Sequence, residues 1–289
     1  MRKFQAKGYI NAVMASVSYG TNPLFALPMY KLGMGVNSVL FYRYLFAVVI
    51  YGLWLKFHKK VSFRLSLQEF VCLFIMAVMF ALSSVALFES FNYLDSGIAC
   101  TILFVYPFMV ALISRLVFKE KFAKRTLVAM VVAVCGIFAL NGGISGHLNV
   151  KGVLLVLFGA LVYAIYIVLV KNLKPIKHIK YDKLSFYVML FGLSVFIYNL
   201  KFCTQLQPIN DWRLLACALA LAFIPTVISL ETINIAIRLI GSTPTAIFGA
   251  LEPLTAIFFG CLCFGEVLTL NSIIGIILIL SGVILVILG

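Results

Sequence analysis

One acidic residue stands in the middle of a long apolar stretch that covers residues 242–266. Glu252 lies nine residues after Thr243, about 14 Å along a helix axis and roughly midway through a hydrocarbon core of about 30 Å. Pro253 follows it and must clash with the carbonyl four residues earlier, so we expect a kinked helix beside the acid. Such an acid could bind a cationic group or carry a proton. Alternatively, it is a hydrogen-bonded glutamate that stabilises the kink.

Two more charged residues fall inside apolar stretches and are candidates for coupling or gating, together with Glu252. Glu231 shares a helical face with Asn234 and Arg238, about 10 Å from the inner end of its span. This position suits an inner gate or a second titrating group. Arg43 lies about 9 Å inside the outer start of its span. It either extends to the interface, contacts the substrate or pairs two helices.

Uncharged polar and aromatic residues within the apolar stretches are candidates for substrate contact. Besides Glu252, they are Tyr19, Asn22, Tyr106, Tyr163 and Tyr166. The alternative for the tyrosines is plain packing. Asn22 belongs to a stripe of small and polar residues, which can line a wet cavity or join two helices.

The residues that enzymes and metal sites need are not grouped in this sequence. Most of the seven cysteines are within apolar stretches, where they behave as small buried residues, and the three histidines fall in links. The GxSG pattern at 143–146 falls in a turn without a base nearby, so we expect no enzyme activity. A phosphate-binding GxxxxGK[ST] motif is absent, which excludes a pumping ATPase. We expect no metal, no cofactor and no disulfide framework.

The elements that carry these residues are membrane-spanning helices. The chain of 289 residues is 64% hydrophobic and 11% charged, with a mean hydropathy of +1.13, far more apolar than a soluble domain. The sequence therefore predicts an all-α polytopic membrane protein with ten spans of roughly twenty residues each. The spans are expected at residues 8–30, 37–57, 69–93, 96–118, 126–143, 152–171, 183–201, 214–237, 243–264 and 270–289.

The net charge of +14 reflects orientation in the membrane. Of the 23 basic residues, 17 fall in tails and links on one side, four fall on the other side, and Arg43 and Arg115 fall within spans. By the positive-inside rule, both ends of the chain are expected in the cytoplasm and the protein in the plasma (inner) membrane. This distribution gives no reason to expect nucleic acid as a partner.

The two halves of the chain, residues 1–143 and 150–289, share landmarks at a constant offset. Each half contains five spans, an odd number, so the second half must insert upside down relative to the first. Inverted repeats with proline-broken helices are typical of secondary transporters. The pairs at an offset of 146 are Ser96/Ser242, Pro107/Pro253, Phe118/Phe264, Glu120/Glu266 and Gly136/Gly282, and Tyr19 pairs with Tyr163 at an offset of 144.

These residues also carry a family resemblance over nearly the whole chain. The Lys-Gly start of spans one and six, Arg43, and the Pro107…Glu120 and Pro253…Glu266 patterns resemble the two EamA-type halves of the drug/metabolite transporter superfamily. The resemblance implies ten helices in two inverted five-helix repeats. It also implies a central cavity lined mainly by spans one, three, four, six, eight and nine, and movement of a small metabolite by alternating access.

The function expected from these features is secondary transport, most simply export, of a small metabolite such as an amino acid or an amphiphilic compound. Its partners would be the substrate, the lipid bilayer and, if Glu252 titrates, protons. The alternative is an uncoupled channel or a membrane scaffold without transport turnover. The sequence leaves the oligomeric state open.

Overall fold

The computed structural model describes residues 2–94, 96–119, 124–140, 149–264 and 270–288, and within them all regular structure is helical. The first half contains α1 (Arg2–Tyr19), α2 (Asn22–Lys31), α3 (Val36–Trp54), the π-helix η1 (Leu55–Lys59), α4 (Leu67–Ser90), α5 (Ser96–Leu103), α6 (Tyr106–Phe118) and α7 (Lys124–Leu140). The second half contains α8 (Val150–Asn172), the 3₁₀ turn η2 (Lys174–Ile176), α9 (Tyr181–Asn199), α10 (Trp212–Ala222), the π-helix η3 (Phe223–Ile228), α11 (Ser229–Ile240), α12 (Ser242–Phe248), α13 (Leu251–Phe264) and α14 (Leu270–Leu288).

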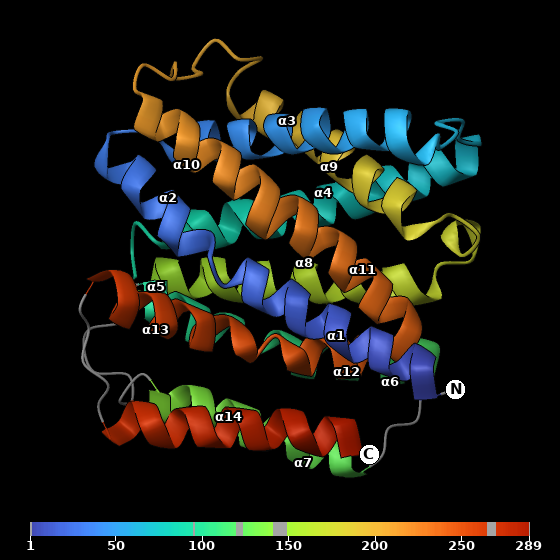
Figure 1. The fold of residues 1–289 in the computed structure, drawn as a ribbon, viewed down its shortest axis with the longest axis vertical. Helices are drawn as coiled ribbons and strands as arrows, with labels where there is room; N and C mark the ends of the chain where they lie inside the picture. The colour runs from blue at the N-terminus through green and yellow to red at the C-terminus, as the bar shows by residue number, and fades with distance from the viewer. Residues whose placement is uncertain (1, 95, 120–123, 141–148, 265–269, 289) are drawn as a thin grey trace.

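These helices form ten segments that run back and forth across the molecule, which confirms the predicted fold class (Figure 1). The segments are α1–α2, α3–η1, α4, α5–α6, α7, α8, α9, α10–η3–α11, α12–α13 and α14. Four unbroken helical stretches within the described residues are long and apolar enough to cross a membrane: Val36–Lys59, Leu67–Ser90, Val150–Asn172 and Trp212–Ile240. The other segments are shorter or are built from two helices.

Three segments are broken near a proline, where its ring would clash with a backbone carbonyl of a continuous helix. A proline ring clashes with the carbonyl four residues earlier, and α1 and α5 end at the residues in that position, Tyr19 before Pro23 and Leu103 before Pro107. In the ninth segment α12 ends at Phe248, directly before the carbonyl that Pro253 would meet. The predicted kink beside Glu252 is therefore an interruption of the helix at residues 249–250.

The eighth segment accommodates its proline differently. Pro225 lies within the π-helix η3, and the Thr226 hydroxyl donates a hydrogen bond of 2.7 Å to the freed carbonyl of Leu221. Because a side chain replaces the lost backbone donor, the segment widens locally and continues.

Helix contacts follow the inverted repeat. Each segment of the first half is paired with the segment at the same place in the second half, the first with the sixth and so on. The packing of α4 on α8 then corresponds to the packing of α1 on α11. In the same way, the packing of α6 on α8 corresponds to the packing of α12 and α13 on α1. The pairs α3/α9, α6/α12 and α7/α14 are their own counterparts. In Figure 1, α1 begins on the right whereas α8 begins on the left. The two halves therefore pack against each other as an inverted repeat.

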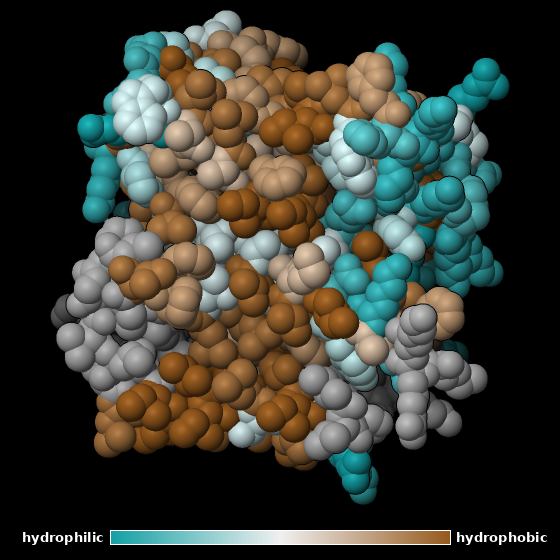
Figure 2. All heavy atoms as spheres, in the orientation of Figure 1, coloured by the Kyte–Doolittle hydropathy of each residue, from teal (hydrophilic) through white to brown (hydrophobic). Residues whose placement is uncertain are grey.

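The surface shows how the molecule lies in a bilayer. Hydrophobic side chains cover the middle of the visible face, and hydrophilic ones gather mainly on its right, where α1 begins and α14 ends (Figure 2). The exposed basic residues of the links beyond α3 and α8 are Lys56, Lys59, Lys60, Arg64, Lys174, Lys177 and Lys180. Both ends of the described chain thus lie on one side of the molecule.

Candidate functional site

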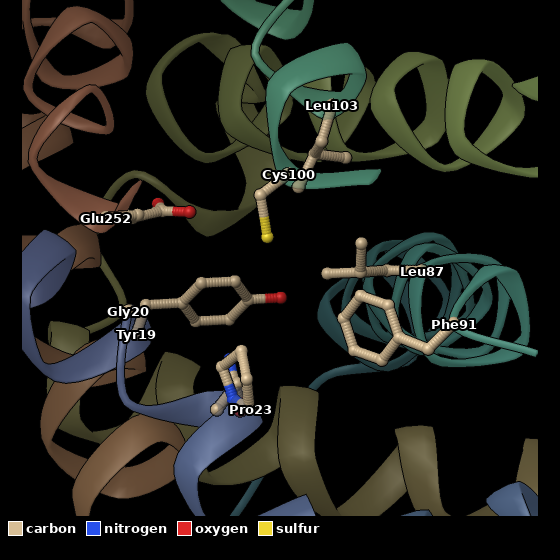
Figure 3. Close-up of a pocket in the computed structure, with 9 residues that line it drawn as sticks. Tyr19, Gly20, Pro23, Leu87, Phe91, Cys100, Leu103 and Glu252 are labelled. Atoms are coloured by element: carbon tan, nitrogen blue, oxygen red, sulfur yellow. The ribbon is translucent and has the colours of Figure 1, made fainter. Parts of the chain in front are cut away.

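A small cavity lies where the broken first, fourth and ninth segments meet α4. Its volume of about 20 Å³ leaves room for about one water molecule. Substrate-sized molecules cannot enter this conformation. The lining residues are Tyr19, Gly20, Asn22, Pro23, Leu87, Phe91, Cys100, Leu103 and Glu252 (Figure 3).

Glu252 supplies the acid of this cavity. It stands in the first turn of α13, directly after the helix interruption. Its carboxylate points into the same space as the ring of Tyr19 and the thiol of Cys100 (Figure 3). Among the described residues it has no hydrogen-bond or ion-pair partner. A carboxylate without a partner at the middle of a membrane protein is available for a proton or a cationic group.

Two glycines allow the broken helices to meet at the cavity. A Cβ atom added to Gly20 would lie 2.5 Å from the backbone oxygen of Glu252, and one added to Gly249 would lie 1.7 Å from the Tyr106 hydroxyl oxygen. Contacts this short are impossible for real side chains, so glycine is required at both positions for this packing.

Asn22 brings an unsatisfied amide to the same cavity. The residue is only 2% exposed, and neither its amide nitrogen nor its amide oxygen has a hydrogen-bond partner among the residues that the structure describes. A buried amide without partners costs free energy. Asn22 can therefore both donate to and accept from a ligand or a water molecule.

Tyr163 and Tyr106 pack beside the cavity without lining it. The Tyr163 ring stacks on Tyr19 with a centroid distance of 6.5 Å, and Tyr106 meets Tyr163 edge-on at 5.0 Å. The Tyr106 hydroxyl donates to the backbone oxygen of Ala246 in α12 at 3.0 Å. The structure thus brings Tyr19, Tyr106 and Tyr163 together, as expected for residues at the interface of the two halves.

Tyr166 continues the stack away from the cavity. Its ring lies 6.3 Å from Tyr163, and its hydroxyl donates to Asn234 at 2.7 Å, whose amide nitrogen donates to Ser185 at 2.9 Å. These hydroxyl and amide groups therefore satisfy one another. In this conformation Tyr166 does not reach the cavity.

Arg43 is fully buried and joins the second segment to the eighth. Its Nε donates to the Thr226 hydroxyl at 2.5 Å and its Nη2 to the Pro225 carbonyl at 3.2 Å. The guanidinium therefore does not extend to an interface, and helix pairing is what the geometry shows. Its third nitrogen, Nη1, has no hydrogen-bond partner within the part of the chain that the structure describes.

The Arg43 contact makes Thr226 a residue with a measurable effect on stability. Replacing Thr226 by valine leaves the buried Arg43 Nε without an acceptor, which should cost about 1–3 kcal/mol. We expect a lower thermal unfolding midpoint in detergent. The control is Thr232→Val in α11, where the hydroxyl bonds only to carbonyls of its own segment, at 2.7 and 3.1 Å. Equal midpoints for the two variants would contradict the role of Thr226.

Glu231 lies outside the cavity, on the side where the basic links gather. It is partly buried, and the groups within its electrostatic reach are Tyr51, Lys59 and Asp182. Lys59 and Asp182 approach to 3.8 Å, and nearby Glu69 and His178 approach to 2.8 Å. These contacts join η1 and the start of α4, in the first half, to His178 and the start of α9, in the second half.

Several residues of the site had no distinct signal in the sequence. Leu87, Phe91 and Leu103 are apolar residues among many, and Cys100 is one of seven cysteines. Gly20 could have been found from its place just before the Asn22-Pro23 pair. Glu120 and Glu266, which form one of the pairs at an offset of 146, and the 143–146 motif lie outside the described residues.

The comparisons with known proteins agree with this architecture. The model of the EamA-like transporter family matches residues 6–142 and 150–288. An uncharacterized transporter of Bacillus subtilis, YcbK, is 26% identical, over 93% of this chain and 89% of its own length. A second one, YetK, is 25% identical, over 78% of this chain and 68% of its own length. A solved crystal structure with 14% identity covers 98% of this chain and 97% of its own chain with a TM-score of 0.78, a likeness of fold. Because the family model matches both halves, the chain belongs to the EamA-like transporter family.

Proposed function

We propose that this transporter exports a small metabolite that bears an ammonium group, such as an amino acid or an amphiphilic amine, in exchange for protons. The observation that carries the proposal is the carboxylate of Glu252. It has no partner among the described residues, and it lines a small cavity where three broken helices meet. A membrane scaffold has no use for an acid in that place.

Proton exchange follows from the chemistry of one carboxylate. Glu252 can hold a proton or pair with a substrate ammonium group, but it cannot do both at once. If the loaded and the protonated forms change conformation more readily than the empty, charged form, substrate and proton must move in opposite directions. The inward proton gradient then drives export.

Alternating access supplies the required movement. The cavity holds about one water molecule, so substrate can enter only after helices separate. The helix interruptions near residues 20–21, 104–105 and 249–250 are suitable hinges because turns with i→i−3 backbone hydrogen bonds replace the regular α-helical pattern there. As the tyrosine stack opens, Tyr106, Tyr163 and Tyr166 would join Tyr19 and Asn22 in contact with the substrate.

Glu231 and Arg43 fit gating roles in this scheme. Glu231 lies beside the ion pair of Lys59 and Asp182, which joins η1 to α9 on the basic side, where an inner gate must part. Arg43 binds the π-helix of the eighth segment, so its contacts change if that segment moves.

The protein is proposed to lie in the plasma membrane with both ends of the chain in the cytoplasm. Both ends of the described chain lie on the side where the hydrophilic side chains gather. A green fluorescent protein fused after residue 289 should fluoresce in a bacterial host, and alkaline phosphatase at the same place should be inactive. Fusions after truncation in the link at residues 32–35 should behave in the opposite way. The reverse pattern would overturn the orientation.

The proposed function is tested with purified protein in lipid vesicles that contain a pH-sensitive dye. External addition of the twenty amino acids and a set of hydrophobic amines, one at a time, should make the interior alkaline for at least one compound as protons leave. The rate should saturate with concentration, and uptake of the radiolabelled compound should rise when unlabelled compound is preloaded inside. An uncoupled channel would show no such acceleration, and a scaffold would move nothing.

A further inference from the structure

The helices α3 and α9 form an antiparallel pair that is tied at both ends. They belong to the second and seventh segments, and they lie at the end of the molecule opposite α7 and α14 (Figure 1). Each segment is followed by a largely exposed link, at residues 60–66 and 200–211. Because the two segments are counterparts in an inverted repeat, a contact at one end should have a counterpart at the other.

At the outer end, away from the basic links, Gln207 holds the link after α9 over the start of α3. The Tyr42 hydroxyl donates a hydrogen bond of 2.9 Å to the Gln207 backbone oxygen, and the Gln207 backbone N–H donates to the Ser38 hydroxyl at 3.2 Å. The Gln207 side chain accepts from the Gly35 N–H at 2.5 Å and donates to the Gly33 carbonyl at 3.1 Å. One residue of the second half therefore binds four residues of the first.

At the inner end, the start of α9 holds the link after η1 in a similar way. The Tyr187 hydroxyl donates to the Phe63 backbone oxygen at 2.5 Å. Lys183 Nζ donates to the Arg64 backbone oxygen, also at 2.5 Å. Here the second half supplies the helix and the first half supplies the link.

These contacts occupy matching positions in the two halves. Tyr42 and Tyr187 are each the seventh residue of their helix, and Ser38 and Lys183 are each the third. All four hold the backbone of the link that follows the other segment. We call the contacts with Gln207 the outer latch and the contacts with the link at residues 60–66 the inner latch.

The second residue of each helix adds a further tie at the same end. Asn199 Nδ2 donates to Asn37 Oδ1 at 3.2 Å, and Lys59 Nζ lies 3.8 Å from Asp182 Oδ2. Asn199 and Lys59 are the last residues of the seventh and second segments. The inverted arrangement therefore extends to the ends of both segments.

Between the two latches the helices touch closely enough to pivot on each other. The rings of Tyr44 and Phe196 have a centroid distance of 4.6 Å. A Cβ atom added to Gly192 would lie 2.9 Å from the Tyr44 ring. A close contact in the middle allows one end of the pair to open while the other end stays closed.

We propose that the two latches are alternating gates, so that the inner latch opens while the outer one stays closed, and the reverse. The cavity holds about one water molecule, so the halves must separate at one end to admit a substrate. Matching contacts give the two open states a similar cost, and a transporter must visit both. Because both links are largely exposed, water can replace each broken hydrogen bond. This inference rests on the alternating access of the proposed function and assigns it to named residues.

Matched tyrosine variants test the proposal in a protein that keeps only Cys100, which lines the cavity. A charged methanethiosulfonate reagent is applied to oriented vesicles from one side at a time. Tyr42→Phe should raise the ratio of outer to inner labelling rates, and Tyr187→Phe should lower it. Each shift should be on the order of threefold, as expected for one hydrogen bond in a two-state equilibrium.

Two controls separate gating from general loosening of the fold. The double variant Tyr42→Phe with Tyr187→Phe weakens both latches equally, so its labelling ratio should return close to that of the wild type. Tyr198→Phe in α9, at a residue that is 71% exposed, should leave the ratio unchanged. Shifts in the same direction for both single variants, or no shift in either, would overturn the proposal.

A disulfide across the outer end tests the same gate by closing it. Asn37→Cys with Asn199→Cys, once oxidised, should abolish labelling of Cys100 from the outer side and retain it from the inner side. Unchanged labelling from the outer side would contradict an outer gate at this place.

The latches and the proposed function can fail separately. Absence of opposite shifts in a protein that exchanges protons would overturn the latches alone. Opposite shifts in a protein that exchanges protons with none of the amino acids or amines would support the latches and count against the proposed function.

Discussion

Replacing Glu252 by glutamine should abolish proton exchange while the protein still folds. Glutamine has nearly the same volume but cannot release a proton or pair with an ammonium group. Because a charge-assisted contact is worth about 1.5–3 kcal/mol, we expect substrate affinity to fall at least about tenfold. Proton movement in vesicles should fall to the background of empty vesicles. Since the carboxylate has no partner among the described residues, the unfolding midpoint should not decrease.

Glu231→Gln is the matched control for this variant. Glu231 is also a partly buried glutamate within a membrane segment, but it lies outside the cavity, beside the links of the basic side. As a gate residue it should change the rate of exchange and leave the number of protons moved per substrate unaltered. Normal exchange by the Glu252 variant, or loss of exchange in the Glu231 variant alone, would contradict the assignment of the proton site to Glu252.

Replacing Gly249 by alanine should disrupt the packing of the ninth segment on the fourth. The added Cβ would lie 1.7 Å from the Tyr106 hydroxyl oxygen and 2.9 Å from its ring carbon. Tyr106 cannot stay in place, and it must lose both its hydrogen bond to Ala246 and its contact with Tyr163. We expect destabilisation of about 1–3 kcal/mol, typical of overpacking, and strongly reduced transport. The unfolding midpoint in detergent and the vesicle assay measure the two effects.

A second substitution tests the cause of this loss. Tyr106→Phe removes the oxygen that the new methyl group would meet, so the double variant Gly249→Ala with Tyr106→Phe should be more stable than the sum of the single changes predicts. Gly159→Ala is the control, because its added Cβ would lie 3.2 Å from the nearest atom, the Cβ of Ala86. Additive effects in the double variant would show that another contact makes Gly249 necessary.

The sequence was most informative about the breaks in the helices. A proline ring clashes with the carbonyl four residues earlier, so Pro23 and Pro107 predict helix ends at Tyr19 and Leu103. The helices α1 and α5 end at these two residues. The membrane spans were predictable for a similar reason, since hydrocarbon thickness fixes their length. The fourth span, for instance, begins at Ser96 and ends at Phe118 as expected.

Contacts between distant segments could not be predicted in the same way. Arg43 bonds to Thr226, 183 positions later, and no period or spacing reveals which helix faces it. Tyr166 and Tyr163 are three residues apart, yet Tyr163 lies against Tyr19 beside the cavity and Tyr166 is held by Asn234. The roles of these residues in binding and gating stay predictions, since the arrangement shows where they lie and only transport measurements show what they do.

Cys100 allows the most direct test of alternating access, because it lines the cavity with Glu252. In a variant that keeps only this cysteine, a small membrane-impermeant thiol reagent is applied from either side of oriented vesicles, with and without a transported substrate. We predict that conditions that speed labelling from one side slow it from the other, since the cavity opens to one side at a time. Labelling rates that rise and fall together on both sides would indicate a channel and contradict the account.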